Sequence, residues 1–469
     1  MKVYYYFSVN DLFFAEASKA ILQTNNAVEF SGLASGKRSF LTNGPFKSIS
    51  YLSELNYTTA EIDYLYLASV EKKYSICISD LINMERHFWK FPKKQRIAYA
   101  QEIIRCIERD YENIGFDMIF AEGLDDFASF FLYAFGKVLN IPFYYFVYAR
   151  MGNAVFLTNR TDTGPVNLEI LFKKAVAEYS VFINQFEETK KYITEYIANK
   201  RQPYYVSQSS MLYRAFSIED IQTTLKSFAK TFQDNKSFNA SGHPLTFPLK
   251  RLAKIKNKVQ YNSFLKTRFV DYTQLKAQGI NYFIYPLHFH PEAATLIQGR
   301  WINNQQAIIE MFSKALPANV ALIVKEHTVS VGRRPIEFYK EIEKLHNVYF
   351  VPEKTAVYEL IENSVGIVTI SSSMGLEAIM LGKPVVTFGD VHYNVLSDVI
   401  KAVDISNMPE YVEMALNFKG YDEAEYWSFF RVVTENCYNM AGYSPHKFTP
   451  ENVDTFRRML ENIMDDVNI

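Results

Sequence analysis

Two short polar stretches of this chain have residue types and positions suited to binding an anion. One, at 325–327, follows an apolar run at 320–324, and the other, at 371–373, follows an apolar run at 365–370. The side chains concerned are Lys325, Glu326, His327, Ser371, Ser372 and Ser373. Apolar runs of this length are typical of buried parallel strands, and open α/β sheets bind ligands beyond the carboxyl ends of their strands.

The two stretches offer complementary groups to a phosphate. A serine cluster that opens a helix presents hydroxyls, free backbone N–H groups and the positive end of the helix dipole. Lys325 adds charge and His327 adds a directed N–H donor. We therefore expect these groups to bind one phosphate together, from neighbouring strand ends. Taken singly, the first stretch could be a surface charge pair and the serines a helix cap. Glu377, one turn further on, could accept from ribose hydroxyls or face solvent.

A third polar stretch, at 286–292, ends another predicted strand. His288 and His290 are two residues apart, so their side chains should point the same way on an extended chain. We assign His290 a catalytic role, His288 a role in substrate binding and Glu292 a place in the donor site. Two histidines could also form a metal pair, but no further ligand set accompanies them in the sequence, so no metal is expected. A solvated loop is the alternative.

Carboxylates gather between a predicted strand at 116–120 and the helix that follows it. They are Glu122, Asp125 and Asp126. Such a group could supply a nucleophile or a general base, whereas Asp125 or Asp126 could instead cap the helix. Glu122 is therefore the preferred catalytic residue and Asp126 a second candidate. Arg150, after the next strand, is expected to bind an anionic substrate or to pair with Glu122.

The order of predicted elements indicates an α/β fold with two domains. Strands and helices alternate at 1–165 and again at 276–420, where five strands enclose four helices. This alternation is typical of parallel sheets wrapped by helices. Residues 166–275 are predicted as a helical insertion and linker, with one helix at 209–232. Residues 421–469 are predicted as helices that pack back toward the first domain.

Composition is that of a soluble globular protein. The chain has 469 residues, 48% hydrophobic and 22% charged, enough for two cores of ordinary size. Its 33 tyrosines and 38 phenylalanines are expected mostly in those cores. The net charge of -1 argues against a nucleic-acid binder. Cys77, Cys106 and Cys437 lie far apart in the sequence, which favours a reducing compartment without structural zinc. Neither a membrane-spanning run nor a signal peptide is evident, so a cytoplasmic location is expected.

A basic span at 250–268 is interleaved with apolar side chains. Its charged residues are Lys250, Arg251, Lys254, Lys256, Lys258, Lys266 and Arg268. Such a run is usually a solvated face, but it could also hold an anionic membrane surface, as a lipid-linked acceptor would require. The sequence leaves both interpretations open.

Together the motifs resemble those of the capsular polysaccharide biosynthesis proteins, the group that contains bacterial Kdo (3-deoxy-D-manno-octulosonic acid) transferases. The resembling segments are PL-x-x-x-PE at 286–292, LIVKEH at 322–327, NVYFV at 347–351 and LIENSVGIVTISSSMGLEAIMLGKPVVTFGD at 360–390. They lie within residues 281–393, and residues 116–159 resemble the family more weakly.

The resemblance implies a GT-B fold, in which two Rossmann-like doubly wound domains face a cleft. The Lys-Glu-His segment is similar to the HP motif, and the serines to the SS motif, that bind CMP phosphate in bacterial sialyl- and Kdo-transferases. By this likeness His327 and serines 371–373 are donor-phosphate ligands, Glu292 joins the cleft, and Glu122 falls near the acidic residue of the N-terminal domain. The chain departs from the family at Thr328, where proline is usual, and at His290, where glutamine is common.

The expected function is a glycosyltransferase that moves Kdo or a related acidic sugar from a CMP-linked donor to a glycan or glycolipid of a bacterial capsule or surface polysaccharide. A CMP-sugar already carries a charged leaving group and no DxD motif is evident, so neither metal nor cofactor is expected. The expected partners are the donor, the acceptor, capsule assembly proteins and the inner membrane face. An epimerase or hydrolase of the same fold, and a non-catalytic capsule assembly component, are the alternatives; fold alone does not separate them.

Overall fold

The computed structural model describes residues 1–8, 11–25, 27–86, 88, 91–200, 246–440 and 449–467. The chain forms two compact units, one made of Met1–Val166 with Asn436–Ile469 and the other of Asn167–Glu435. The helix predicted at 209–232 and part of the basic span lie outside the residues whose side chains are described. Within the described residues, no helix is both long enough and apolar enough to cross a lipid bilayer.

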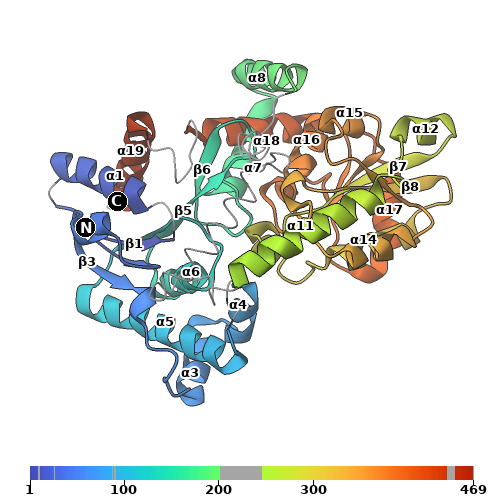
Figure 1. Ribbon diagram of the computed structural model, residues 1–469. Helices are drawn as coiled ribbons and strands as arrows, with labels where there is room; N and C mark the ends of the chain where they lie inside the picture. The colour runs from blue at the N-terminus through green and yellow to red at the C-terminus, as the bar shows by residue number, and fades with distance from the viewer. Residues whose placement is uncertain are drawn as a thin grey trace. The chain divides into compact units, whose positions relative to one another are not determined.

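The first unit is built on a seven-stranded sheet in the order β13-β6-β5-β4-β1-β2-β3 (Figure 1). Its strands are β1 (Lys2–Phe7), β2 (Glu29–Ala34), β3 (Phe46–Tyr51), β4 (Met118–Ala121), β5 (Phe143–Tyr148), β6 (Ala154–Thr158) and β13 (Tyr438–Asn439). Its helices are α1 (Asp11–Thr24), α2 (Ser39–Thr42), α3 (Tyr64–Tyr74), α4 (Ile78–Met84), α5 (Lys93–Ile114), α6 (Phe127–Leu139) and α19 (Pro450–Val467). The pairs among β1 to β5 are parallel, whereas β6 pairs antiparallel with β5 and with the edge strand β13.

The C-terminal helix α19 completes the aromatic core of this unit. It packs against α1, and Phe456 lies 5.2 Å from the Phe14 ring, 5.3 Å from Phe120 and 4.9 Å from Phe146, measured between ring centroids. Edge-to-face aromatic contacts of this kind add to the free energy of burial. These rings confirm that aromatic residues are used in the core, and they bring the end of the chain back onto the first sheet.

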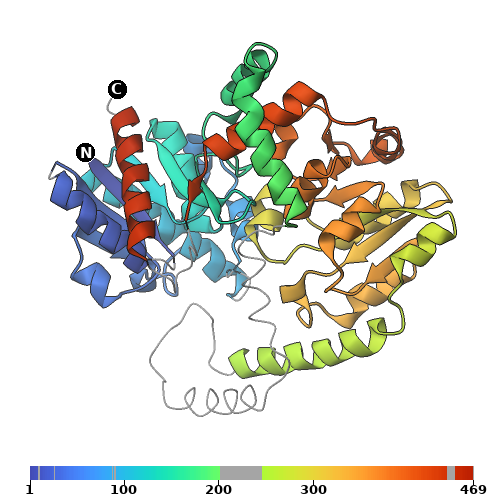
Figure 2. The same cartoon turned by 90° about the horizontal axis from the view of Figure 1, so that it is seen from above.

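The second unit is built on a six-stranded parallel sheet in the order β12-β11-β10-β7-β8-β9. Its strands are β7 (Asn281–Pro286), β8 (Val320–Lys325), β9 (Val348–Val351), β10 (Gly366–Thr369), β11 (Val385–Thr387) and β12 (Ile400–Lys401). Its helices are α7 (Leu168–Tyr179), α8 (Glu187–Ala198), α11 (Thr246–Leu265), α12 (Tyr272–Ala277), α13 (Gln305–Ala315), α14 (Ile336–Glu343), α15 (Val357–Glu362), α16 (Ser373–Met380), α17 (Met408–Leu416) and α18 (Glu423–Glu435) (Figure 2).

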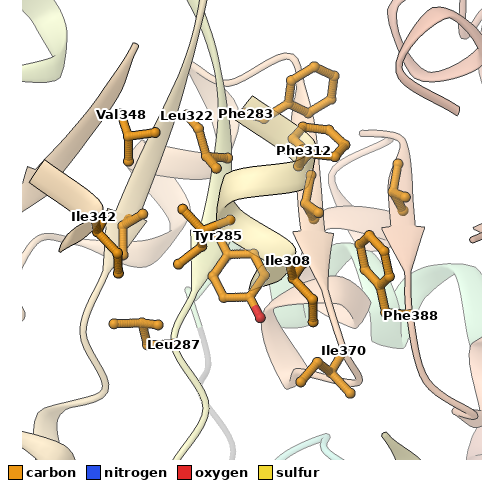
Figure 3. Packing of buried hydrophobic residues seen from close by; sticks show 14 of the residues in the cluster. Phe283, Tyr285, Leu287, Ile308, Phe312, Leu322, Ile342, Val348, Ile370 and Phe388 are labelled. Carbon is orange, nitrogen blue, oxygen red and sulfur yellow. The ribbon is translucent and has the colours of Figure 1, made fainter. Parts of the chain in front are cut away.

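Alternating side chains of this sheet build two covered faces. Phe283, Tyr285 and Leu287 point into one core with Ile308 and Phe312 of α13, as Figure 3 shows. Helices α11, α14 and α17 contribute to the same core. Burial on both faces explains why the strands read as continuous apolar runs. The predicted fold class of two Rossmann-like α/β units is confirmed, as is the alternation of five strands with four helices from β7 to β11.

One expectation about the sheet is wrong. The polar stretches after β8 and β10 do not end neighbouring strands, because β7 lies between them. Two strand spacings correspond to about 10 Å between the strand ends. The order of the elements in the sequence suggested that the two strands are neighbours. In a doubly wound sheet, however, the chain returns to the middle of the sheet after the first strands and adds the next strands on the other side. The strand order reverses at β7, which is where ligands bind in such sheets.

Candidate functional site

The carboxyl ends of β7 and β10 are joined by His288, which is only 6% exposed. Its N–H donates to Gln305 Oε1 at 2.6 Å, and its carbonyl accepts from Gln305 Nε2 at 3.2 Å and from Arg334. Its Nε2 accepts from the Ser371 N–H at 3.2 Å and lies 3.3 Å from the Thr369 hydroxyl. These contacts lie inside the protein. They favour a positioning role for His288 over the substrate contact predicted from the sequence.

Glu326 organises the end of β8. It is 2% exposed, and its carboxylate accepts from the His327 N–H at 2.7 Å, from Arg334 Nε at 3.0 Å and from the Tyr339 hydroxyl. Burial raises the pKa of Glu326, and the Arg334 charge opposes that rise. The three donors offset the cost of removing a carboxylate from water. Through Arg334, which also donates to the His288 carbonyl, the end of β8 is tied to the end of β7.

His327 presents a neutral ring with an N–H donor. Its Nδ1 accepts from the Val329 N–H at 3.3 Å. A backbone N–H can only donate, so Nδ1 is unprotonated and the proton of the neutral ring is on Nε2. Burial, together with the positive charges of Lys325, Arg334 and Arg333, lowers the pKa of His327 to about 4. The directed donor expected from the sequence is therefore available at neutral pH.

The three predicted serine ligands have different environments. The Ser371 hydroxyl donates to the Ala294 carbonyl at 3.2 Å and is buried. Ser372 caps α16, its hydroxyl accepting from the Met374 N–H at 3.1 Å. Ser373 is the first residue of α16, and its hydroxyl has no hydrogen-bond partner among the described residues. Ser371 and Ser372 thus hold the turn, whereas Ser373 and the start of the helix are left for a ligand.

Lys325 and Glu377 are both buried, and they make no direct ion pair with each other. Lys325 is 7% exposed, its Nζ donates to the Glu353 carbonyl at 2.5 Å, and burial lowers its pKa. Lys325 is therefore buried and bonded to the backbone, so its side chain is not exposed to contact a ligand directly. Glu377, 5% exposed in α16, has no hydrogen-bond partner within the described residues. Burial raises the pKa of Glu377 to about 8, although the Lys325 charge opposes the rise.

A buried carboxylate without donors makes the free protein less stable, and replacement E377Q should reveal this. The folded-state pKa of Glu377 lies above its unfolded value of 4.5, so the folded protein binds the extra proton and loses stability as pH rises from about 4.5 to about 8. Relative to the E377Q variant, the free energy of unfolding of the wild type should fall by about 1 kcal/mol per pH unit between pH 5 and 7. Urea denaturation across this range measures the difference, and a pH-independent difference would contradict the prediction.

His290 and Glu292 lie on the exposed side of the same stretch. His290 Nδ1 is 2.9 Å from Thr295 Oγ1, and burial with the Arg334 charge lowers the pKa of His290. The Glu292 carbonyl accepts from the Thr295 N–H at 3.0 Å, just before the π-helical segment η4 (Ala294–Gln298). The expectation that His288 and His290 point the same way is wrong, because one is buried and the other exposed. Strand alternation does not apply here, since β7 ends at Pro286.

In the first unit, the predicted carboxylates lie between β4 and α6. Glu122 Oε2 accepts from the Ser8 N–H at 3.0 Å and from the Ser8 hydroxyl at 2.9 Å, which joins the ends of β4 and β1. Asp126 caps α6, accepting from the Ser129 N–H at 2.8 Å and from the Tyr6 hydroxyl at 2.5 Å. The capping alternative is thus confirmed for Asp126. With both of its oxygens engaged, Asp126 is poorly suited to the catalytic role predicted for it.

Asp125 pairs with Arg86 just before the start of α6. Burial raises the pKa of Asp125 to about 6; the Arg86 charge opposes the rise, and the charges of Asp126 and Glu122 add to it. Such a value lies in the range that suits a general base near neutral pH. Arg150 lies in the turn between β5 and β6 with a φ of 62°, in the left-handed region, and its expected pairing with Glu122 stays a prediction.

Two arginines of the loop between β8 and α14 were not among the predicted site residues. Arg334 makes the buried pair with Glu326, and Arg333 adds positive charge near His327. Their signal was present as an adjacent Arg-Arg pair soon after the Lys-Glu-His stretch, yet nothing in the sequence indicated that the loop folds back onto β7. Among the described residues, no group of three His, Cys, Asp or Glu side chains is arranged to hold a metal ion.

These groups define a polar site at the carboxyl edge of a parallel sheet, of the type that binds ligands in α/β proteins. We call His327, Ser373, Glu377 and the N-terminus of α16 the strand-end site. Residues 197–398 match the family model of the capsule polysaccharide biosynthesis proteins, which confirms over these residues the resemblance found in the motifs.

Other known proteins are similar over shorter stretches or more distantly. Protein FixF of Sinorhizobium fredii is 44% identical over 50 residues, which cover 11% of this chain and 12% of FixF. The KpsC β-Kdo 2,4-transferase of Thermosulfurimonas dismutans has 14% identity and a TM-score of 0.36, covering 73% of this chain and 88% of KpsC. The UDP-GlcNAc 2-epimerase of Methanocaldococcus jannaschii has 12% identity and a TM-score of 0.29, covering 93% and 99%. Likeness at this level assigns no activity.

Proposed function

We propose that this protein is a glycosyltransferase that transfers an acidic sugar, Kdo or a related one, from a CMP-linked donor to a glycan or glycolipid acceptor of a bacterial capsule or surface polysaccharide. The match of residues 197–398 to the capsule polysaccharide biosynthesis family supports a glycosyltransferase-like role. The observation that carries the proposal is the strand-end site. The site contains the neutral His327 donor, the start of α16 and Glu377, whose carboxyl group has no hydrogen-bond partner among the described residues. The strand ends that carry these groups are linked by one hydrogen-bond network.

Each group of the site has a role in binding such a donor. The His327 Nε2–H and the free groups at the start of α16 would bind the phosphate. Glu377 would accept hydrogen bonds from the ribose diol, which supplies the donors that its carboxylate lacks in the free protein. As the bond to the sugar breaks, the phosphate gains negative charge, so donors aimed at it bind the transition state more tightly than the ground state. This proposal needs no metal ion.

Within the proposal, the general base that activates the acceptor hydroxyl comes from the acidic group of the first unit, and Asp125 is its best candidate. Glu122 is held by Ser8 and Asp126 by the cap of α6, whereas the pKa of Asp125 is raised to about 6. Glu122, preferred from the sequence, remains the second candidate.

Ligand binding and CMP release test the proposed function. Calorimetry should detect CMP binding to the wild type, and CMP should raise its thermal denaturation temperature. Incubation with CMP-Kdo or CMP-sialic acid and an acceptor should release CMP. Above pH 8, where Glu377 is ionised, E377Q should bind CMP at least 10-fold more weakly than the wild type, because the amide is a poorer acceptor for a diol than a carboxylate. Stabilisation by UDP but not by CMP would contradict the donor class and favour the epimerase alternative.

Replacement D125N should remove a pH dependence. A base with a pKa of about 6 must be deprotonated to act, so kcat/KM of the wild type should rise with pH through about 6 and then level off. D125N should lower kcat by about 100- to 10000-fold and lose that inflection. E122Q is the matched variant: if E122Q abolishes the inflection and D125N keeps it, the base is Glu122 and our assignment is wrong.

The same proposal places the protein at the inner face of the membrane, working with capsule assembly proteins on a lipid-linked acceptor. The basic residues of α11 would bind the anionic lipid. Co-sedimentation with vesicles containing anionic phosphatidylglycerol, compared with neutral phosphatidylcholine vesicles, tests this location.

A further inference from the structure

Arg333 is held by two contacts at the outer end of β7. Its Nε–H donates to the Val329 carbonyl at 3.1 Å. Its guanidinium carbon lies 4.7 Å from the centroid of the Phe289 ring, and Phe289 directly follows His288. The hydrogen bond at Nε and the contact with the Phe289 ring restrict the position of the guanidinium.

The terminal nitrogens of this guanidinium have no partner in the described part of the chain. Neither Nη1 nor Nη2 of Arg333 makes a hydrogen bond or ion pair with a described residue. The neighbouring Arg334 contrasts with it, since Arg334 uses Nε for Glu326 and Nη2 for the His288 carbonyl. Burial of part of the side chain lowers the pKa of Arg333, but the residue as a whole is exposed, so its terminal nitrogens are open to a ligand from solvent. An exposed guanidinium fork that has no ion pair with a described residue can bind an anionic ligand through two parallel hydrogen bonds.

The strand-end site already accounts for one phosphate. His327 and the start of α16 provide its donors, and Arg333 is near enough for its charge to lower the pKa of His327. Arg333 itself is anchored to Val329 and Phe289, beyond the end of the central strand. The planar fork of a guanidinium binds a carboxylate through two parallel hydrogen bonds, which a lone ammonium cannot do.

We propose that Arg333 binds a second oxyanion of the donor, the carboxylate of the transferred sugar, and thereby selects acidic over neutral sugars. This inference rests on the proposed function, because it takes a CMP-linked sugar as the donor. In such a donor the sugar carboxylate is the second anionic group after the phosphate. In a nucleoside diphosphate sugar the second anionic group would be the second phosphate, and the guanidinium could bind that group in the same way.

Binding measurements on R333Q test the inference. Calorimetry would compare wild type, R333Q and R333K with CMP, CMP-Kdo and CMP-sialic acid, and with UMP and UDP. R268Q is the control, because the Arg268 guanidinium also lies over a phenylalanine ring, 4.1 Å from the Phe264 centroid, three residues beyond the end of α11, but pairs with Glu343. R333Q should weaken binding of the two CMP-sugars by about 10- to 100-fold and change CMP binding less than 2-fold. R333K should lie between wild type and R333Q, and R268Q should match the wild type.

Other outcomes overturn the inference in distinguishable ways. Equal weakening of CMP and CMP-sugars by R333Q would mean that Arg333 binds the phosphate. Unchanged binding of both would mean that Arg333 contacts no part of the donor. If the wild type prefers UDP to UMP and R333Q loses that preference, the second oxyanion is a phosphate and the sugar-carboxylate assignment is wrong. If the wild type binds none of these nucleotides, the proposed function fails and this inference fails with it.

Discussion

Replacing His327 by alanine is expected to lower kcat for sugar transfer by about 100- to 1000-fold, the usual effect of removing one donor from developing negative charge. His327 is the only residue of the strand-end site that combines a fixed tautomer with a directed side-chain N–H, since Nδ1 is occupied by the Val329 N–H. Its pKa of about 4 means that it donates as a neutral ring above pH 5, so it adds no inflection to the rate near neutrality. CMP release from CMP-Kdo under saturating donor measures kcat.

Two conservative variants distinguish the role of the His327 Nε2–H donor from that of the contact between Nδ1 and the Val329 N–H. The amide N–H₂ of glutamine reaches the position of Nε2, so H327Q should recover part of the lost rate. The amide oxygen of asparagine reaches the position of Nδ1 and keeps the Val329 contact, so H327N should be as slow as H327A. His346 is an exposed histidine of the same unit, and H346A serves as the control. A decrease of less than 3-fold in H327A, or equal rates for H327Q and H327N, would rule out the phosphate role.

Replacing Glu326 by alanine is expected to lower the free energy of unfolding by about 3–5 kcal/mol, because removing one member of a buried ion pair leaves the other charge uncompensated. The Arg334 side chain is 12% exposed and the Glu326 side chain 2%. The variant also removes the acceptor of the Tyr339 hydroxyl and of the His327 N–H. Urea denaturation measures the loss.

The double variant E326L/R334M should regain much of this stability, since an apolar pair can replace a buried ion pair without leaving a charge behind. It should not regain sugar transfer, because the anchor of the His327 backbone is lost. Glu341 pairs with Lys344 on the exposed face of α14, so E341A should change stability by less than about 1 kcal/mol. An E326A variant within 1 kcal/mol of the wild type would show that Glu326 does not hold the end of β8.

Much of the second unit could be predicted from local patterns. Strands buried on both faces require uninterrupted apolar residues, and such runs mark β7, β8 and β10 in the sequence. The helix cap at Ser372 and the cap at Asp126 were also predictable, because an N-cap depends on a side chain and a backbone N–H only two or three residues apart. In the first unit the sequence did not indicate the strands β2 and β3, since Gly32, Ser48 and the mixed burial of β3 interrupt the apolar pattern.

The sequence by itself determined which residue types end the parallel strands, and therefore where in the chain a polar site could form. Only the tertiary structure decided which of those groups are free. It gave His288 Nε2 and the Ser371 hydroxyl internal partners, buried Lys325, left the Glu377 carboxyl group without a donor among the described residues and placed Arg333 beside Phe289. The reason is that hydrogen-bond partners and desolvation come from residues distant in the chain. Gln305 lies 17 positions from His288, and Ser371 lies 83 positions from it. No local pattern encodes such contacts, whereas strand ends and helix caps are local.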